Sequence, residues 1–286
     1  MGYLYEAADD FLQEAPAVSP PGRTRAPMPA SQHVRGPLQL PRIVRRETEP
    51  PAETLYVRIP LGSEDPAAPL TGIFLPNGYR AQPTVDVLLY LHGFKALELS
   101  IAGYWRRSRY PNHILREELN ASNKNVVLVA PTLGPHSQAG WLVHRGGLDR
   151  YLGSVRAALA QSGAHRGTTP PLRHLILSCH SGGGWPMRQL ALGSGDAPAH
   201  VRECWGFDCL YNRGDETAWV AWARARPSAR LYIHYGSGHT AAKSELLRRQ
   251  GVPNVFVEGS VQLAHDAVPR AHWRERLRAA GFLDDV

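Results

Sequence analysis

The 286-residue sequence has little cysteine and no long apolar run. Its three cysteines, Cys179, Cys204 and Cys209, form no CxxC pair, which excludes a disulfide framework and a zinc knuckle and favours free thiols. No segment approaches the ~20 consecutive apolar residues of a transmembrane helix. The acidic N-terminal sequence, MGYLYEAADDFLQ, lacks the basic and apolar regions of a Sec signal peptide. We therefore expect a cytoplasmic protein without a transmembrane segment, with non-classical export left open.

Lysine is nearly absent, so arginine carries almost all of the positive charge in a chain with a formal net charge of +7. A basic balance raises the question of nucleic acid or another anionic partner. The arginines are scattered along the chain, which favours a solvated surface, and we expect no nucleic-acid partner. The best candidates for an anionic contact are two clusters: Arg42, Arg45 and Arg46, and Arg106, Arg107 and Arg109.

Several signatures of other chemistry are missing from the sequence. It contains no GxxxxGK[ST] phosphate loop, no HExxH motif, no GxGxxG after a strand and no His/Cys cluster with zinc spacing. These absences argue against nucleotide-dependent enzymes and zinc enzymes, and we expect neither a metal nor an organic cofactor. With 43% hydrophobic and 20% charged residues, the composition is typical of a globular domain.

Proline and arginine are frequent in residues 15–53, which show no apolar period. Proline interrupts helices and strand ladders, so we expect an extended linker or a surface strap there. We therefore divide the chain into an N-terminal extension, 1–53, and a folded domain, 54–286. A short amphipathic helix is expected at 3–13, and the extension is the candidate segment for a protein partner.

From residue 54 onward, strand and helix patterns alternate along the chain. Two alternating segments, 54–59 and 70–75, predict an antiparallel hairpin or meander. Apolar runs typical of strands covered on both faces occur at 85–91, 125–130, 172–178, 202–207, 230–235 and 254–259. Helical patterns lie between these runs, as at 148–159 and 240–250. The sequence therefore predicts an α/β fold with a doubly wound, mostly parallel sheet and helices on both faces.

The clearest chemical signal is the segment LILSCHSGGGW, in which an apolar strand leads directly into Ser181 and a helical pattern follows. Small residues, Cys179 and Gly183, lie two positions to either side of the serine. A serine on a strained turn between strand and helix needs small neighbours, as in the nucleophile elbow G-x-S-x-G. Cysteine replaces the first glycine of that motif here. The alternatives are an inert serine in a glycine-rich turn and a phosphate cradle at a helix N-terminus.

With this elbow, the chain over residues 54–286 resembles the α/β-hydrolase superfamily of serine esterases and lipases. A second motif supports the resemblance: LLYLHGF ends a strand about ninety residues before the serine, at the position of the family's oxyanion loop. The resemblance implies two backbone N–H donors for a developing oxyanion, those of Gly182 and Phe94. The side chain of His92 is expected to brace this loop.

The resemblance also implies a catalytic base after the last strand, where the family order of serine, acid and histidine places His265. His239, after the preceding strand, is the competitor. His272 lies about two helical turns beyond His265. His180, beside the serine, is expected to point into the packing of the elbow.

The catalytic acid follows from the same resemblance. The commonest position, after the strand RLYIHY, offers no carboxylate. A known variation places the acid after the preceding strand, where Asp208 stands, and the acid there would hold the imidazole in one tautomer. Asp215 and Glu216 are the alternatives, either as the acid or as helix caps.

Aromatic residues in or near loops at the same edge of the sheet suit an apolar acyl or aromatic substrate, or pack the loops. The loop 208–216 is short, so no large cap domain is expected. The candidate pocket residues are His92, Gly93, Trp105, Trp141 and Trp185.

Together these residues predict a serine hydrolase that cleaves small-molecule or polymeric carboxylic esters through an acyl-enzyme. Two alternatives stay open. One is an amidase or peptidase that uses the same residues, and the other is a catalytically silent hydrolase-fold protein with a binding or effector role.

Overall fold

The computed structural model describes residues 40–49, 52–62, 70–94, 101, 105, 115–161, 163–236 and 238–286. They belong to the compact unit that runs from Leu38 to Val286. The helix predicted at 3–13, most of the proline-rich stretch and the arginine cluster at 106–109 lie outside the described residues.

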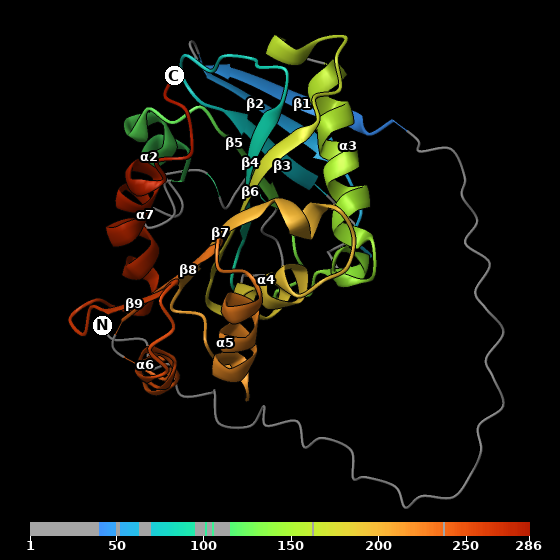
Figure 1. The fold of residues 1–286 in the computed structure, drawn as a ribbon. Helices are drawn as coiled ribbons and strands as arrows, with labels where there is room; N and C mark the ends of the chain where they lie inside the picture. The colour runs from blue at the N-terminus through green and yellow to red at the C-terminus, as the bar shows by residue number, and fades with distance from the viewer. Residues whose placement is uncertain are drawn as a thin grey trace, which may run out of the picture. The chain divides into compact units, whose positions relative to one another are not determined.

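Within the described residues, one sheet of nine strands has the order β1-β2-β3-β5-β4-β6-β7-β8-β9 (Figure 1). The strands are β1 Arg42–Glu49, β2 Ala52–Arg58, β3 Leu70–Leu75, β4 Val85–Leu91, β5 Val127–Pro131, β6 Leu172–His180, β7 Val201–Phe207, β8 Arg230–Tyr235 and β9 Val255–Gly259. The pairs β1–β2, β2–β3 and β3–β5 are antiparallel, and all pairs from β5–β4 to β8–β9 are parallel. The predicted mostly parallel sheet with antiparallel N-terminal strands is confirmed.

Helices cover both faces of the sheet, as predicted. They are α2 Leu115–Ser122, α3 Gly147–Gln161, α4 Gly184–Ala191, α5 Asp215–Ala225, α6 Ala241–Arg249 and α7 Val268–Ala279. One hydrophobic cluster contains residues of α3, α4, α5 and α6, and a second contains residues of α2 and α7. Alternate residues of the strands belong to the two clusters, so the clusters lie on opposite faces. None of the helices in the described part of the chain combines the length and apolar character needed to cross a membrane.

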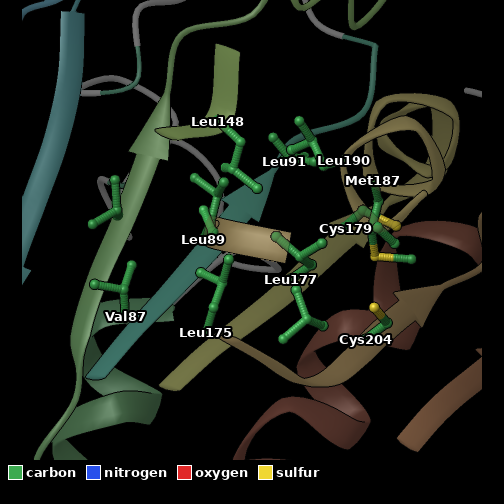
Figure 2. Packing of buried hydrophobic residues seen from close by; sticks show 14 of the residues in the cluster. Val87, Leu89, Leu91, Leu148, Leu175, Leu177, Cys179, Met187, Leu190 and Cys204 are labelled. Atoms are coloured by element: carbon green, nitrogen blue, oxygen red, sulfur yellow. The ribbon is translucent and has the colours of Figure 1, made fainter. Parts of the chain in front are cut away.

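The central strands β4 and β6 are buried on both faces. On the face that α3 and α4 cover, side chains from both strands interlock with those of the helices (Figure 2). The labelled core residues there include Val87, Leu89, Leu91, Leu175, Leu177, Met187 and Leu190. Leu88, Tyr90 and Ile176 point to the opposite face and are buried too. This double burial explains the continuous apolar runs in the sequence and fixes the carboxyl ends of both strands.

The structure differs from the prediction for the stretch before residue 54, because β1 and the start of β2 replace the expected linker. β1 is an edge strand with a bulge between Ile43 and Arg45, and most of its side chains are exposed. Arg45 pairs with Glu47, and Arg46 lies 2.8 Å from Glu53. A solvated edge strand needs no apolar alternation, and its charges discourage pairing with other chains. The folded body therefore starts ahead of the predicted boundary.

We expect removal of residues 1–39 to change the melting temperature by less than about 2 °C. Removal of residues 1–50 also deletes β1 and leaves the edge of β2 unpaired, so we expect a fall of about 5 °C or more. Thermal unfolding followed by circular dichroism compares the two variants. A large fall after removal of 1–39 alone would show that the segment before residue 40 contributes to the fold.

Candidate active site

The topology singles out one edge of the sheet. β4 lies between β5 and β6, and the helices that follow β4 and β6 cover opposite faces. This reversal is a topological switch point, and in open α/β sheets ligands bind in the crevice outside the strand ends at such a point. The loop after β4 and the turn after β6 therefore meet where a substrate is expected.

Ser181 is the first residue after β6 and opens a short 3-10 helix, Ser181–Gly183, that leads into α4. Its φ angle is +54°, a left-handed conformation that is uncommon for a residue with a side chain. A Cβ added to Gly183 would collide with the carbonyl oxygen of Leu91. Such strain persists only where the surroundings enforce it, and it often marks a functional position.

Cys179, which replaces the first glycine of the elbow motif, is buried in the core beside α4 (Figure 2). Its thiol forms a hydrogen bond with the thiol of Cys209, the residue after Asp208. The cysteine side chain is therefore accommodated by the core and does not obstruct the turn at Ser181.

The loop after β4 lies against the turn at Ser181. A Cβ added to Gly93 would come within 2.6 Å of the Cβ of Ser181, and one added to Gly182 within 2.6 Å of the Phe94 ring. The His92 Nδ1–H donates to the carbonyl oxygen of Gly93 over 2.7 Å, and Nε2 accepts from the backbone N–H of Leu133 over 2.8 Å. The His92 side chain is thus buried within the loop, as a brace and not as a pocket wall.

We expect Gly93→Ala to lower kcat/KM by about tenfold to 10²-fold, since a displacement of about 1 Å at a reacting group costs that much. The added methyl group would displace either the loop or Ser181. Gly153→Ala is the matched control, because Gly153 lies in α3 with open space around the added Cβ. That control should keep full activity and gain slightly in stability. Equal activity of both variants would contradict the close approach at Gly93.

His265 and Asp208 lie together next to the elbow. The Nδ1 atom of His265 is 2.7 Å from Oδ2 of Asp208, a hydrogen-bond distance. Asp208 follows β7 with a φ of +49°, and its backbone N–H donates to the carbonyl oxygen of His234 over 2.7 Å. A second residue in a strained conformation is thus fixed next to the imidazole.

The Asp208 carboxylate is held in its ionised form. Its Oδ1 accepts hydrogen bonds from the Thr240 hydroxyl and, over 3.3 Å, from the backbone N–H of Gly236. Burial raises the pKa of the Asp208 carboxyl, but the hydrogen bonds from His265, Thr240 and Gly236 outweigh burial and bring the pKa below its usual value. Thr240 stands at the N-cap position of α6, yet its hydroxyl donates to Asp208 and does not cap the helix.

Tyr211 was not predicted as a site residue. Its hydroxyl lies 3.5 Å from Nδ1 of His265 and interacts with the Ser181 side chain. Burial raises the pKa of the Tyr211 phenol well above its usual value, so the group is neutral at ordinary pH. On another side of the imidazole, the His180 ring lies 4.4 Å from the His265 ring, and its Nε2–H donates to the His265 carbonyl oxygen over 3.2 Å.

The competing residues lie elsewhere. Asp215 begins α5, where it pairs with Arg188 at 2.5 Å and accepts from the backbone N–H of Asn212. His239 is exposed in the loop before α6, and His272 is buried in α7. Neither histidine takes the place beside Asp208 that His265 occupies.

The tryptophans suggested for the pocket have different environments. Trp105 is fully buried and packs against Gly72 of β3, inside the hydrophobic core. The Trp141 indole N–H donates to the carbonyl oxygen of Pro60 over 2.8 Å, and its ring lies under Arg150. Trp185, in the first turn of α4, is 40% exposed, and Phe94 and Tyr211 are 65% and 42% exposed. These three exposed aromatic rings come from three different loops or turns.

Two groups of described side chains bring possible metal ligands close together. The first, His180, His265 and Asp266, lies in the candidate site itself. The second, His234, Glu258 and His272, joins β8, β9 and α7.

No model of a known protein family matches the sequence. Curated proteins give no match either. Among solved structures, an S-formylglutathione hydrolase from Agrobacterium tumefaciens is similar with a TM-score of 0.51 and 13% identity, over 82% of this chain and 99% of that chain. The enterobactin and salmochelin hydrolase IroE has a TM-score of 0.45 and 19% identity, over 73% of this chain and 87% of its own. Est1E from Butyrivibrio proteoclasticus has a TM-score of 0.43 and 12% identity, over 80% and 97%. The similarity to the first structure shows a shared fold. The similarity to the other two is too weak to support a further conclusion.

Proposed function

We propose that this chain, which has the α/β-hydrolase fold, is a serine hydrolase that cleaves carboxylic esters. One observation carries the proposal: a strained serine stands at the topological switch point, and His265, whose ring lies 4.4 Å from that of His180 next to the serine, contacts a buried carboxylate over 2.7 Å. A structural serine needs neither the strained backbone nor this combination of neighbours. Nucleophilic acyl transfer uses an activated serine and a base that a third group orients, which are the roles proposed for Ser181, His265 and Asp208.

In the proposed reaction, the Ser181 hydroxyl attacks the ester carbonyl while His265 takes its proton. Because Nδ1 of His265 is occupied by Asp208, Nε2 is the nitrogen that accepts the proton. The ionised Asp208 keeps the imidazole in that tautomer and stabilises its charged form. His265 then returns the proton to the leaving alcohol, and a water molecule releases the acyl group from Ser181 by the same steps.

The carbonyl oxygen of the ester becomes an oxyanion when Ser181 attacks, and this oxyanion needs hydrogen-bond donors that are already in place. The backbone N–H groups of Gly182 and Phe94 are the proposed donors, since Gly93 brings the loop after β4 directly against Ser181. The brace at His92 holds that loop, so the donors need no reorganisation during the reaction. Preorganised donors of this kind contribute several kcal/mol, about 3 kcal/mol for each in measured cases.

The surroundings of Ser181 favour an ester with an apolar acyl or aromatic part. Phe94, Trp185 and Tyr211 expose aromatic surface, which binds apolar groups through desolvation. The connection between β7 and α5 spans only the residues from Asp208 to Gly214, so no large cap is inserted there.

A panel of esters and amides with graded acyl length tests the proposed function, with Ser181→Ala as the inactive control. We expect hydrolysis of esters, higher kcat/KM for apolar acyl groups than for acetyl, and much slower hydrolysis of the matched amides. Faster turnover of amides would assign the chain to amidases or peptidases. Absence of turnover on the whole panel, in a folded protein, would contradict an esterase.

Asp208→Asn should lower kcat by at least ~10², because the amide favours the wrong imidazole tautomer, which costs up to ~10⁴ in serine proteases. Asp215→Asn should lower kcat less than tenfold, since Asp215 pairs with Arg188 at the start of α5. Steady-state kinetics on one ester compares the two variants. A larger loss from Asp215→Asn would move the acid to the alternative position and leave Ser181 and His265 in their roles.

A further inference from the structure

We propose that His234, Glu258 and His272 form a binding site for a divalent transition metal, best suited to zinc. The site joins β8, β9 and α7 and is separate from the residues assigned to ester hydrolysis. It does not depend on the proposed function, because every observation that supports it concerns these three side chains and their immediate neighbours.

The three side chains place one donor atom each within 4.8 Å of the others. Nδ1 of His234 lies 3.3 Å from Oε2 of Glu258, across the parallel pair β8–β9. His272 reaches the same place from α7, with its ring 4.1 Å from the His234 ring. The donors thus come from three elements that are far apart in sequence, as in a site built by the fold.

Both imidazoles are buried and have nitrogens without a hydrogen-bond partner among the described residues. His234 is 5% exposed and neither of its ring nitrogens has such a partner, and the same holds for Nδ1 of His272. A buried polar atom left unpaired costs about 1–3 kcal/mol, so such atoms in a native protein call for a specific explanation. Coordination of one metal ion satisfies a nitrogen of each ring.

The remaining nitrogen of His272 is already engaged. Its Nε2 lies 3.1 Å from the Ser260 hydroxyl, and an Nε2–H that donates to this oxygen leaves the lone pair of Nδ1 free for a metal. Metal-binding histidines characteristically use their second nitrogen in this way, which fixes both tautomer and ring orientation. Metal ions bind histidine through the lone pair of its neutral ring, which this tautomer of His272 leaves on Nδ1.

The donor set selects the class of metal. Two neutral imidazoles and one carboxylate suit zinc and its first-row neighbours, whereas calcium and magnesium prefer oxygen ligands alone. The Glu258 side chain is 61% exposed, so water can complete a four-coordinate site from the solvent side. The two rings are stacked with their planes 19° apart, so binding requires one ring to turn out of the stack and direct its nitrogen toward the ion.

The charges around the site permit a cation. Arg276 faces His234, but it lies 3.2 Å from Glu203 and covers the Tyr232 ring. Glu275 and Glu258 face His272 and favour positive charge there. The metal would connect the two ends of the segment that contains His265, because Glu258 and Ser260 precede this residue and His272 follows it.

Isothermal titration of the metal-stripped full chain with zinc chloride tests the site. We expect one equivalent of zinc to bind, and His234→Ala and His272→Ala each to weaken its affinity by ~10²-fold or more. Ser260→Ala should weaken it by about tenfold, since only the orientation of His272 is lost. The matched control, His239→Ala, removes an exposed histidine and should leave the affinity unchanged.

A second metal and a milder variant keep the test informative if an alanine variant fails to fold. Cobalt(II) should give the intense visible absorption of a four-coordinate site in the wild-type chain and lose it in Glu258→Gln, an exposed change. The rival site is the group His180, His265 and Asp266. Zinc affinity that survives His272→Ala but is lost in His265→Gln would overturn the proposal, and so would a failure of the wild-type chain to bind zinc.

Discussion

Ser181→Ala is expected to lower kcat for ester hydrolysis by at least ~10³, because a nucleophile, base and acid act as a unit and the loss of one disables all. The residual rate over water would come from substrate binding and the backbone N–H donors alone. The fold should persist, since the substitution removes only the hydroxyl oxygen and keeps the Cβ atom. Circular dichroism and the melting temperature verify that the variant is folded.

The matched control for this variant is Ser154→Ala. Ser154 is half-buried on α3, and its hydroxyl donates to the backbone carbonyl of Arg150, one turn earlier, over 3.2 Å. We expect wild-type activity from this control. Substantial turnover by Ser181→Ala would mean that the chemistry takes place at another residue.

His265→Ala should reduce kcat to a similar extent, by ~10³ or more. Among the described residues, His265 is the histidine whose imidazole contacts the Asp208 carboxylate. Without the imidazole, the serine hydroxyl has no base to accept its proton. His239→Ala is the control, because His239 is exposed in the neighbouring loop and should keep turnover within about twofold of wild type. If the His239 variant is inactive and the His265 variant is not, the base has been assigned to the wrong loop.

The strands of the sheet were predictable from sequence where helices bury both faces of the strand, because such strands need apolar residues. β3, β4 and β8 have the bounds expected from sequence, because each is mostly apolar and is followed at once by a proline, histidine or glycine: Pro76, His92 and Gly236. β6 extends two residues beyond its apolar run, to His180, because the strand continues to the turn at Ser181. β1 was missed because an exposed edge strand carries no such pattern.

The position of the site was predictable, but its contacts were only partly so. Ser181 and Asp208 each follow a strand, and parallel strands bring their carboxyl ends to one edge, so sequence order was enough to place them. Tyr211 and Thr240 complete the surroundings through loop conformations, for which no local sequence signal exists. The burial of Trp105 could not be predicted either, because it depends on packing against Gly72, which is far away in sequence.

Covalent labelling tests the role of Ser181 most directly. The folded wild-type chain is treated with a fluorophosphonate, and the modified residue is located by mass spectrometry of its peptides. We expect a single adduct on Ser181, strongly reduced labelling in His265→Ala and no adduct in Ser181→Ala. An adduct on a different serine, or no labelling of the folded wild-type chain, would contradict the assignment of Ser181 as an activated nucleophile.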